Sequence, residues 1–179
     1  MNDFDLLHIY VDGSCLENRN VTNNTKAGWG FCVIKGDTGL GRGRGEIVHE
    51  SNGEVITNHQ KPDFIGAEVG SNNTGELSAI AHSLRWVLSN VEKMEIVICS
   101  DSTYAGNIAS GKWKAKANIR LAKLTQGLWK EVTISNKLSW KHVRAHRGHR
   151  WNERADHLAF RAMKNEAVLP LQFWKPGLR

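Results

Sequence analysis

Three absences narrow the class of protein before any motif is considered. The 179-residue sequence has only three cysteines, Cys15, Cys32 and Cys99, an odd number whose spacing suggests neither a disulfide framework nor a metal site. No apolar run approaches the ~18 residues that cross a membrane. The acidic Asp3 and Asp5 stand where a signal peptide would be basic and then apolar. We therefore expect a soluble, cytoplasmic protein with no membrane association.

The sequence also lacks internal repeats and low-complexity linkers. Its length and its 40% hydrophobic content allow one sizeable core and do not favour two. We expect a single catalytic domain over residues 1–166, a tail over 167–179, and a monomer without an obligate protein partner. Lys and Arg number 24 against 18 Asp and Glu, giving a net charge of +6 and a pI near 9.4. This balance fits either a polyanionic partner or simply good solubility.

What is present is an alternation of strand-like and helix-like segments. Short apolar runs predict strands over 6–11, 27–34, 95–99 and 138–143, and three- and four-residue apolar spacing predicts helices starting at 73 and over 102–109, 119–132 and 152–164. Asn73 with Glu76, and Asn152 alone, are the expected helix caps. Pro170 and Pro176 indicate an extended tail. The order predicts an α/β fold with a mixed sheet.

The stretch from residue 39 to residue 70 gives a weaker signal. Residues 39–48 and 54–59 have the composition of strands, but Gly, Asn and Lys61-Pro62-Asp63 interrupt them. Two interpretations of the 32–70 segment remain open, because it can extend the preceding hairpin or add a surface contact.

Four acidic residues lie at the ends of the strongest elements. Asp12 follows the first strand, Asp101 follows the strand over 95–99, Glu76 lies in the first turn of a helix, and Asp156 lies early in the last helix. Open α/β sheets bind ligands beyond their strand ends. Clustered carboxylates raise one another's pKa and need cations, and hard oxygen ligands select Mg²⁺ or Mn²⁺.

Each of these four residues also has an ordinary structural explanation when taken alone. Asp12 with Gly13 is a common turn, and Glu76 can be half of a capping box. Asp101 can help cap the next helix, and Asp156 can favour the positive end of its helix dipole.

Local sequence distinguishes the two explanations. Residues 11–16 read VDGSCL and are followed by Asn18; residues 72–77 read NNTGEL, and residues 100–104 read SDSTY. The last block runs through Trp140, Val143, His146, Gly148, His149, Asn152, Glu153 and Asp156. Together these blocks resemble the type 1 ribonuclease H family, in order, from about residue 6 to residue 164. The resemblance implies a ribonuclease H-like fold with a five-stranded mixed sheet flanked by helices.

The resemblance also implies an activity. In that family the four acidic positions, here Asp12, Glu76, Asp101 and Asp156, bind two Mg²⁺ ions, for which Mn²⁺ is a possible substitute. The expected reaction is endonucleolytic hydrolysis of the RNA strand of an RNA–DNA hybrid by a two-metal-ion mechanism, leaving 5′-phosphate and 3′-hydroxyl ends. His146 stands where the family has a mobile-loop histidine that assists proton transfer or product release.

Expected substrate contacts follow from the same resemblance. The 2′-hydroxyl is the feature that distinguishes RNA from DNA. The residues expected to contact sugars and phosphates are Gly13, Ser14, Cys15, Asn18, Asn72, Asn73 and, more weakly matched, Thr103. Asn72 and Asn73 can instead be ordinary loop and cap residues. Lys112, Trp113 and Lys114 combine charge with a stacking aromatic, which suits a nucleic-acid backbone, although charge runs are usually solvated faces.

Two parts of the sequence depart from the family pattern. The stretch between Tyr104 and Trp140 is too short for the full basic protrusion of bacterial members, and the 32–70 segment is longer than usual. There is also no room before Asp12 for a separate hybrid-binding module.

Two rival functions remain open. One rival is another nuclease or transferase on the same fold, such as a transposase or resolvase-like enzyme. The other is a non-catalytic nucleic-acid-binding module. The four acidic positions argue against it, because clustered carboxylates without a function would lower stability through mutual repulsion.

Overall fold

A five-stranded sheet forms the centre of the computed structural model, which describes residues 5–179. The strands are β1 (Asp5–Cys15), β2 (Ala27–Lys35), β3 (Glu46–Glu54), β4 (Met94–Ser100) and β5 (Lys137–His142), in the spatial order β3-β2-β1-β4-β5. β1, β2 and β3 pair antiparallel, whereas β4 is parallel to both β1 and β5. The prediction of an α/β fold with a five-stranded mixed sheet is confirmed.

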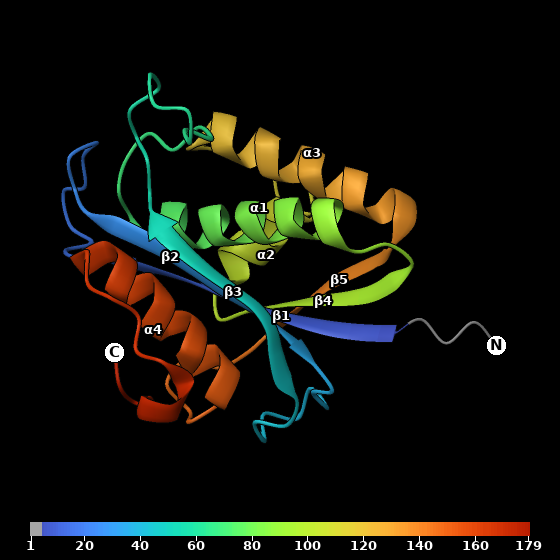
Figure 1. The fold of residues 1–179 in the computed structure, drawn as a ribbon. Coiled ribbons are helices and arrows are strands. Elements are labelled where there is room, and N and C mark those ends of the chain that lie inside the picture. Colours follow the sequence, from blue (N-terminus) through green and yellow to red (C-terminus); the bar gives the residue numbers. More distant parts are fainter. Residues whose placement is uncertain (1–4) are drawn as a thin grey trace.

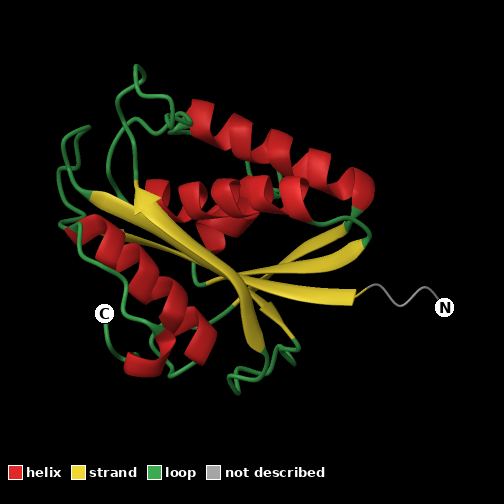
Figure 2. Ribbon diagram, in the orientation of Figure 1, coloured by secondary structure: helices red, strands yellow, loops and turns green. Residues whose placement is uncertain are grey.

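Helices cover both faces of this sheet (Figure 1). One face carries α1 (Asn72–Asn90), α2 (Thr103–Ala109) and α3 (Ile119–Ser135), and the other carries α4 (Arg150–Lys164). Figure 2 shows the resulting three layers, with the strands between the two groups of helices. No helix in residues 5–179 is long and apolar enough to cross a membrane.

The alternation of side chains along the strands builds a core on each face. In β1, Ile9 and Val11 point to the α1–α3 side, while Tyr10 between them points to α4. The α1–α3 core contains buried residues that include Val11, Phe31, Val33, Ile80, Leu84, Ile96, Ile98 and Leu121. The smaller α4 core contains Tyr10, Cys32, Ile34, Cys99, Trp151, Ala155 and Leu158. Both faces of the central strands are therefore apolar, which explains their continuous hydrophobic runs.

Glycines on β2 allow α4 to lie directly on the sheet. A β-carbon at Gly28 would come within 2.3 Å of the Ala159 carbonyl oxygen, and one at Gly30 within 2.7 Å of the Ala159 amide nitrogen. Any side chain at either position would force the helix away. This close approach fixes the height of α4, and with it the position of Asp156.

Three details of the predicted elements were wrong. β1 does not end at a turn over residues 12–14, because it stays paired with β2 as far as Cys15. Ser71, rather than Asn73 with Glu76, caps α1 through a capping box with Thr74. The side chain of His149 rather than Asn152 caps α4. In both helices the cap lies nearer the N-terminus than the apolar periodicity suggested.

The long 32–70 segment does extend the hairpin. Residues 36–45 form the loop between β2 and β3, and this loop reaches β5 at the other edge of the sheet. Trp151 donates its indole N–H to the Arg44 carbonyl at 2.8 Å, and Lys141 donates to the Gly39 carbonyl at 2.8 Å. Within the loop, Asp37 is buried and accepts a hydrogen bond from the Tyr10 hydroxyl. The loop therefore packs against β5 and the start of α4.

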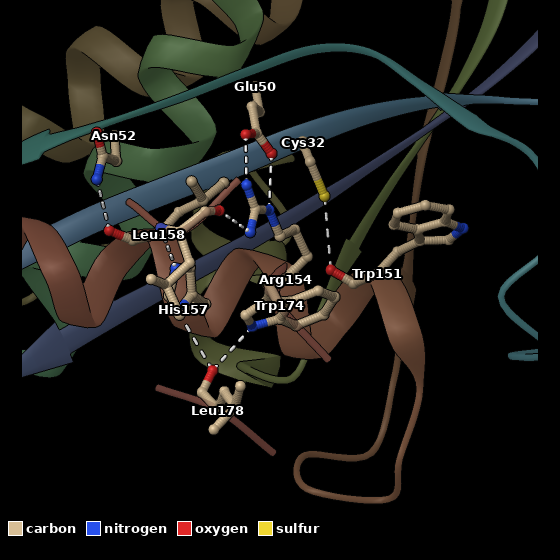
Figure 3. A network of polar contacts seen from close by, with 10 residues as sticks. Cys32, Glu50, Asn52, Trp151, Arg154, His157, Leu158, Trp174 and Leu178 are labelled. Carbon is tan, nitrogen blue, oxygen red and sulfur yellow. Dashed lines mark hydrogen bonds and ion pairs between the residues drawn. The ribbon is translucent and has the colours of Figure 1, made fainter. Parts of the chain in front are cut away.

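The residues after α4 are not the extended tail that the prolines indicated. A 3₁₀ turn at Leu171–Phe173 brings Trp174 into a buried position. The Trp174 and His157 rings both contact the Leu178 carbonyl, as Figure 3 shows. Residues 165–179, called here the 165–179 segment, thus fold back along α4.

Candidate active site

Three of the predicted carboxylates lie together at one point of the structure. Oxygen atoms of Asp12, Glu76 and Asp101 all lie within 4.8 Å of one another, and Asp12 and Glu76 are buried. The last pair of residues in the β1–β4 ladder is Tyr10 with Cys99. Asp12 and Asp101 each follow that pair by two residues, so β1 and β4 place them side by side just beyond the point where the two strands stop pairing.

Two glycines bring Glu76 to the same point. A β-carbon at Gly13 would come within 2.4 Å of the Glu76 amide nitrogen, and one at Gly75 within 2.7 Å of the Gly28 carbonyl. The first turn of α1 therefore rests directly on β1 and β2. The sequence needs glycine at both positions because no larger residue permits this approach.

Burial controls the ionisation of this cluster. Removal from water raises the pKa of Asp12 well above its usual range, and the negative charges of Asp101 and Asp156 raise it further. Burial likewise raises the pKa of Glu76, with the neighbouring Asp12 as the next cause. The pKa of the less buried Asp101 is also raised, again mainly by desolvation. Three carboxyl groups in such surroundings ionise together only when cations neutralise them.

Hydrogen bonds hold the cluster in shape. The Gly13 amide donates to Asp12 Oδ1 at 2.8 Å. The buried Ser100 hydroxyl donates to Glu76 Oε2 at 3.4 Å and accepts from the Ser102 amide at 3.0 Å. The donor set consists entirely of hard carboxylate oxygens, so these residues fit a divalent cation that prefers oxygen ligands.

The structure places Asp156 near this cluster but not within it. Its charge acts on both Asp12 and Asp101. Its own carboxylate, however, is paired with Arg179, whose Nε and Nη2 atoms lie 3.0 and 3.1 Å from the two oxygens. Asp12, Glu76 and Asp101 thus converge, whereas Asp156 is paired with Arg179, a contact that the sequence analysis did not anticipate.

His146 lies in the exposed loop between β5 and α4, in the left-handed backbone region with φ of 52°. A positive charge on His146 would lower the pKa of Asp101, against the larger effect of burial. A second histidine, His142, was missed by sequence reasoning, although its ring nitrogen lies 3.2 Å from the Asp101 carbonyl oxygen. The strand register pairs Ser100 with His142. Only that register, which the sequence does not reveal, identifies it.

Many of the predicted substrate contacts line one groove beside the cluster. A groove of about 920 Å³ is bordered by Asn18, Asn73, Tyr104, Lys112, Trp113 and Lys114, among others. Asn18 accepts a hydrogen bond from the Asn72 amide at 3.2 Å, which ties the loop after β1 to the start of α1. Asn72 and Asn73 are exposed. The asparagines and the basic segment, far apart in sequence, thus share one surface.

The remaining predicted contacts lie at the margins of that surface. Thr103 is exposed at the start of α2. Ser14 is buried, and the Cys15 thiol donates to the Gly70 carbonyl at 3.2 Å. The side chains of Ser14 and Cys15 are therefore occupied in packing, and their backbone is what they can offer to a ligand. In residues 5–179 no additional helix lies between α2 and α3, in agreement with the shortened protrusion expected from the sequence.

The acidic cluster can bind a divalent metal ion, and similarity to known proteins identifies the chain as a hydrolytic nuclease. The RNase H family model matches residues 5–164, so the chain belongs to the RNase H family, and the resemblance to its type 1 members is confirmed. The chain is 30% identical over 171 residues to ribonuclease H of Janthinobacterium sp. (strain Marseille), covering 89% of this chain and 97% of the relative. It is 29% identical over 164 residues to ribonuclease H of Neisseria meningitidis serogroup C, covering 87% and 93%.

Solved structures share the same fold. RNase H1 from Halobacterium salinarum NRC-1 has a TM-score of 0.63 and 23% identity, with 89% of this chain and 98% of that chain covered. LC11-RNase H1 in complex with an RNA/DNA hybrid has a TM-score of 0.61 and 21% identity, with 89% and 97% covered.

Proposed function

We propose that this protein is an endoribonuclease that hydrolyses the RNA strand of RNA–DNA hybrids. The observation that carries the proposal is the convergence of Asp12, Glu76 and Asp101 within 4.8 Å, on a fold whose α1, the helix of Glu76, also borders a groove lined by asparagine and basic residues. Relatives that carry the ribonuclease H name cover nearly the whole chain, and one structure of this fold was solved with an RNA/DNA hybrid.

The carboxylates would hold two Mg²⁺ ions, with Mn²⁺ as a possible substitute. Asp12, Glu76 and Asp101 offer the buried oxygens, and Asp156 is the proposed fourth ligand. When bound, such a pair supplies an activated water and stabilises the leaving oxygen, which gives 5′-phosphate and 3′-hydroxyl products. The residues contribute a fixed arrangement: Ser100 positions Glu76, and the Gly13 amide positions Asp12.

His146 is the proposed proton carrier. Imidazole is the side chain best suited to exchange protons at neutral pH. Two observations support this role: His146 lies in the exposed loop before α4, and its charge would act on Asp101. His142, on the neighbouring strand end, contacts the backbone of Asp101 and is proposed as a positioning residue.

Hybrid recognition is assigned to the groove and to the turn beside it. Asn18, Asn72 and Asn73, with the backbone of Gly13, Ser14 and Cys15 and a lesser contribution from Thr103, would contact the 2′-hydroxyl groups and phosphates of the RNA strand. The position of Asn72 and Asn73 near Glu76 supports this role, because the residues that contact the RNA strand would then lie next to the carboxylates that cleave it.

The basic segment is assigned to the other strand of the hybrid. Lys112, Trp113 and Lys114 are exposed, and the Trp113 side chain is stacked on nothing in the described residues. Ammonium groups beside an exposed indole suit a sugar–phosphate backbone. Only the loop over residues 110–118 joins α2 to α3 where a full protrusion is usual, so we expect weaker or more salt-sensitive binding.

We also propose a monomeric enzyme that works in the cytoplasm. All the proposed site residues come from one chain, so no second copy is needed to complete the site. The three cysteines are free thiols, two of them buried, as expected in a reducing compartment. Sedimentation at working concentration and fractionation of cells check these two points.

A substrate panel tests the activity. End-labelled RNA–DNA hybrid, duplex DNA and duplex RNA are each incubated with Mg²⁺, and the product ends are identified by their sensitivity to phosphatase and ligase. The proposal requires cleavage of RNA in the hybrid alone, with 5′-phosphate ends. Cleavage of the DNA strand would favour the rival nuclease or transferase on the same fold, and binding without cleavage would favour a non-catalytic module.

A further inference from the structure

Arg179 grips both oxygens of the Asp156 carboxylate. Its Nε atom donates to Oδ2 at 3.0 Å and its Nη2 atom donates to Oδ1 at 3.1 Å. The Asp156 side chain is only 8% exposed, whereas that of Arg179 is 47% exposed. Paired, bidentate contacts of this kind are the strongest arrangement that arginine makes with a carboxylate. One lone pair on each oxygen that a metal ion would use is therefore already occupied.

The 165–179 segment is anchored so that Arg179 arrives at this place. Trp174 is 4% exposed and donates its indole N–H to the Leu178 carbonyl at 2.9 Å. Arg161 on α4 donates from Nε and Nη2 to the Arg179 carbonyl at 3.3 and 3.1 Å. The Arg179 guanidinium also lies 4.5 Å from the centre of the Phe160 ring. The backbone and the side chain of Arg179 are thus both held by α4, the helix that carries Asp156.

We propose that Arg179 is a built-in competitor for cations at Asp156. The guanidinium takes one lone pair of each carboxylate oxygen that a metal ion would use, and the two positive charges repel at that distance. A cation that uses Asp156 therefore competes with the Arg179 pair. The inference rests on the proposed metal-binding role of Asp156.

This competition makes the two cation positions unequal. The oxygens of Asp12, Glu76 and Asp101 have no cationic side chain paired with them among the ion pairs of residues 5–179, so a first cation meets no such competitor there. A second cation, dependent on Asp156, binds at higher concentration because it competes with the Arg179 guanidinium for the same carboxylate. Half-exposed ion pairs are worth little, so the expected penalty in affinity is about two- to fivefold.

Isothermal titration of the folded full chain with Mn²⁺ tests the proposal without any measurement of activity. Arg179→Ala is expected to bind the weaker of the two cations about two- to fivefold more tightly than the wild type, and Arg179→Lys to fall between them. Lys175→Ala is the matched control, because it removes one exposed positive charge from the same segment and is expected to leave both affinities unchanged. Thermal unfolding in chelator checks that each variant is folded.

The Asp156→Asn background separates direct competition from a general effect of charge. In that background, Arg179→Ala should no longer change Mn²⁺ affinity. Unchanged or weaker Mn²⁺ binding by Arg179→Ala in the wild-type background, or a gain that persists with Asp156→Asn, would overturn the inference alone. Mn²⁺ binding that is absent, or unaffected by Asp12→Asn and Asp156→Asn alike, would overturn the proposed function as well.

Discussion

The first turn of α1 rests so closely on β1 that a β-carbon at Gly13 would come within 2.4 Å of the Glu76 amide nitrogen. This contact connects the two elements that carry Asp12 and Glu76. It also makes Gly13 a structural requirement of the site, independently of any contact that its backbone makes with substrate.

Gly13→Ala is therefore expected to separate Glu76 from Asp12. The methyl group meets backbone, which cannot give way as a flexible side chain would, so we expect a loss of about 1–3 kcal/mol in the free energy of unfolding and a large loss of hybrid cleavage. Chemical denaturation and initial cleavage rates measure the two effects.

Gly127→Ala is the matched control for that substitution. Gly127 lies on the exposed side of α3, with nothing within 4 Å of a β-carbon. Alanine should stabilise the helix by about 0.5–1 kcal/mol and leave cleavage unchanged. Equal stability and activity in Gly13→Ala and the wild type would contradict the close contact between β1 and α1.

The raised pKa values of Asp12 and Glu76 predict how stability depends on pH without metal. Both carboxyls keep a proton to higher pH in the folded state than in the unfolded one, so between these pKa values the folded protein binds more protons. The free energy of unfolding in chelator should then fall as pH rises above about 4, the pKa region of unfolded carboxyls. Chemical denaturation in chelator at several values between pH 4 and pH 8 measures this fall in the free energy of unfolding.

Removing one buried carboxylate should restore part of the free energy of unfolding that is lost in chelator as the pH rises. Glu76→Gln is expected to raise the free energy of unfolding in chelator at pH 7, because burial disfavours the charged carboxylate, while reducing the stabilisation that added Mg²⁺ provides. Glu92→Gln, at an exposed carboxylate, is the control and should change neither. A destabilised Glu76→Gln protein in chelator would show that Glu76 is stabilising when charged.

An ion pair between the buried Arg154 and the partly exposed Glu50 fixes α4 to β3. Arg154 is 1% exposed, donates to both Glu50 oxygens at 2.9 and 2.7 Å, and also donates to the Leu169 carbonyl (Figure 3). Glu50→Ala leaves a buried guanidinium without its counter-charge and should cost about 3–5 kcal/mol. Glu166→Ala breaks the more exposed pair with Arg161 and should cost less than about 1 kcal/mol. Similar losses in both variants would contradict this difference.

Salt dependence tests the groove. Each lysine that contacts a phosphate contributes about 0.9 to the slope of log affinity against log salt, so Lys112→Ala with Lys114→Ala should reduce that slope by up to about 1.8. Trp113→Ala should weaken binding with little change in slope, because stacking releases no counterions. Lys130→Ala, an exposed charge on α3, is the control. An unchanged slope in the double variant would remove the basic segment from the interface.

Most of the fold could be predicted from the sequence because both faces of β1, β2 and β4 are buried. Continuous apolar runs mark such strands, and the three- and four-residue spacing marks α1, α3 and α4. The helix starts were less predictable. Ser71 and His149 cap through contacts that the apolar pattern does not encode, and β1 continues to Cys15 only because β2 is there to pair with it.

The site was predictable where local sequence places it and not where tertiary register does. Asp12, Glu76 and Asp101 stand in recognisable strings, and they converge. The proximity of His142 to Asp101 depends on the β4–β5 register. The Arg179 contact depends on the 165–179 segment folding back along α4, for which two prolines gave the wrong indication.

The central claim is that the carboxylate cluster performs metal-dependent cleavage of the RNA strand. The most direct measurement is the initial rate of hybrid cleavage by Asp101→Asn and by the wild type across a Mg²⁺ titration. Asparagine keeps the shape and removes the charge, so the account predicts a rate at least about 100-fold lower, about 2.7 kcal/mol, at every Mg²⁺ concentration. Cleavage by Asp101→Asn at the wild-type rate, or wild-type cleavage that continues in chelator, would contradict it.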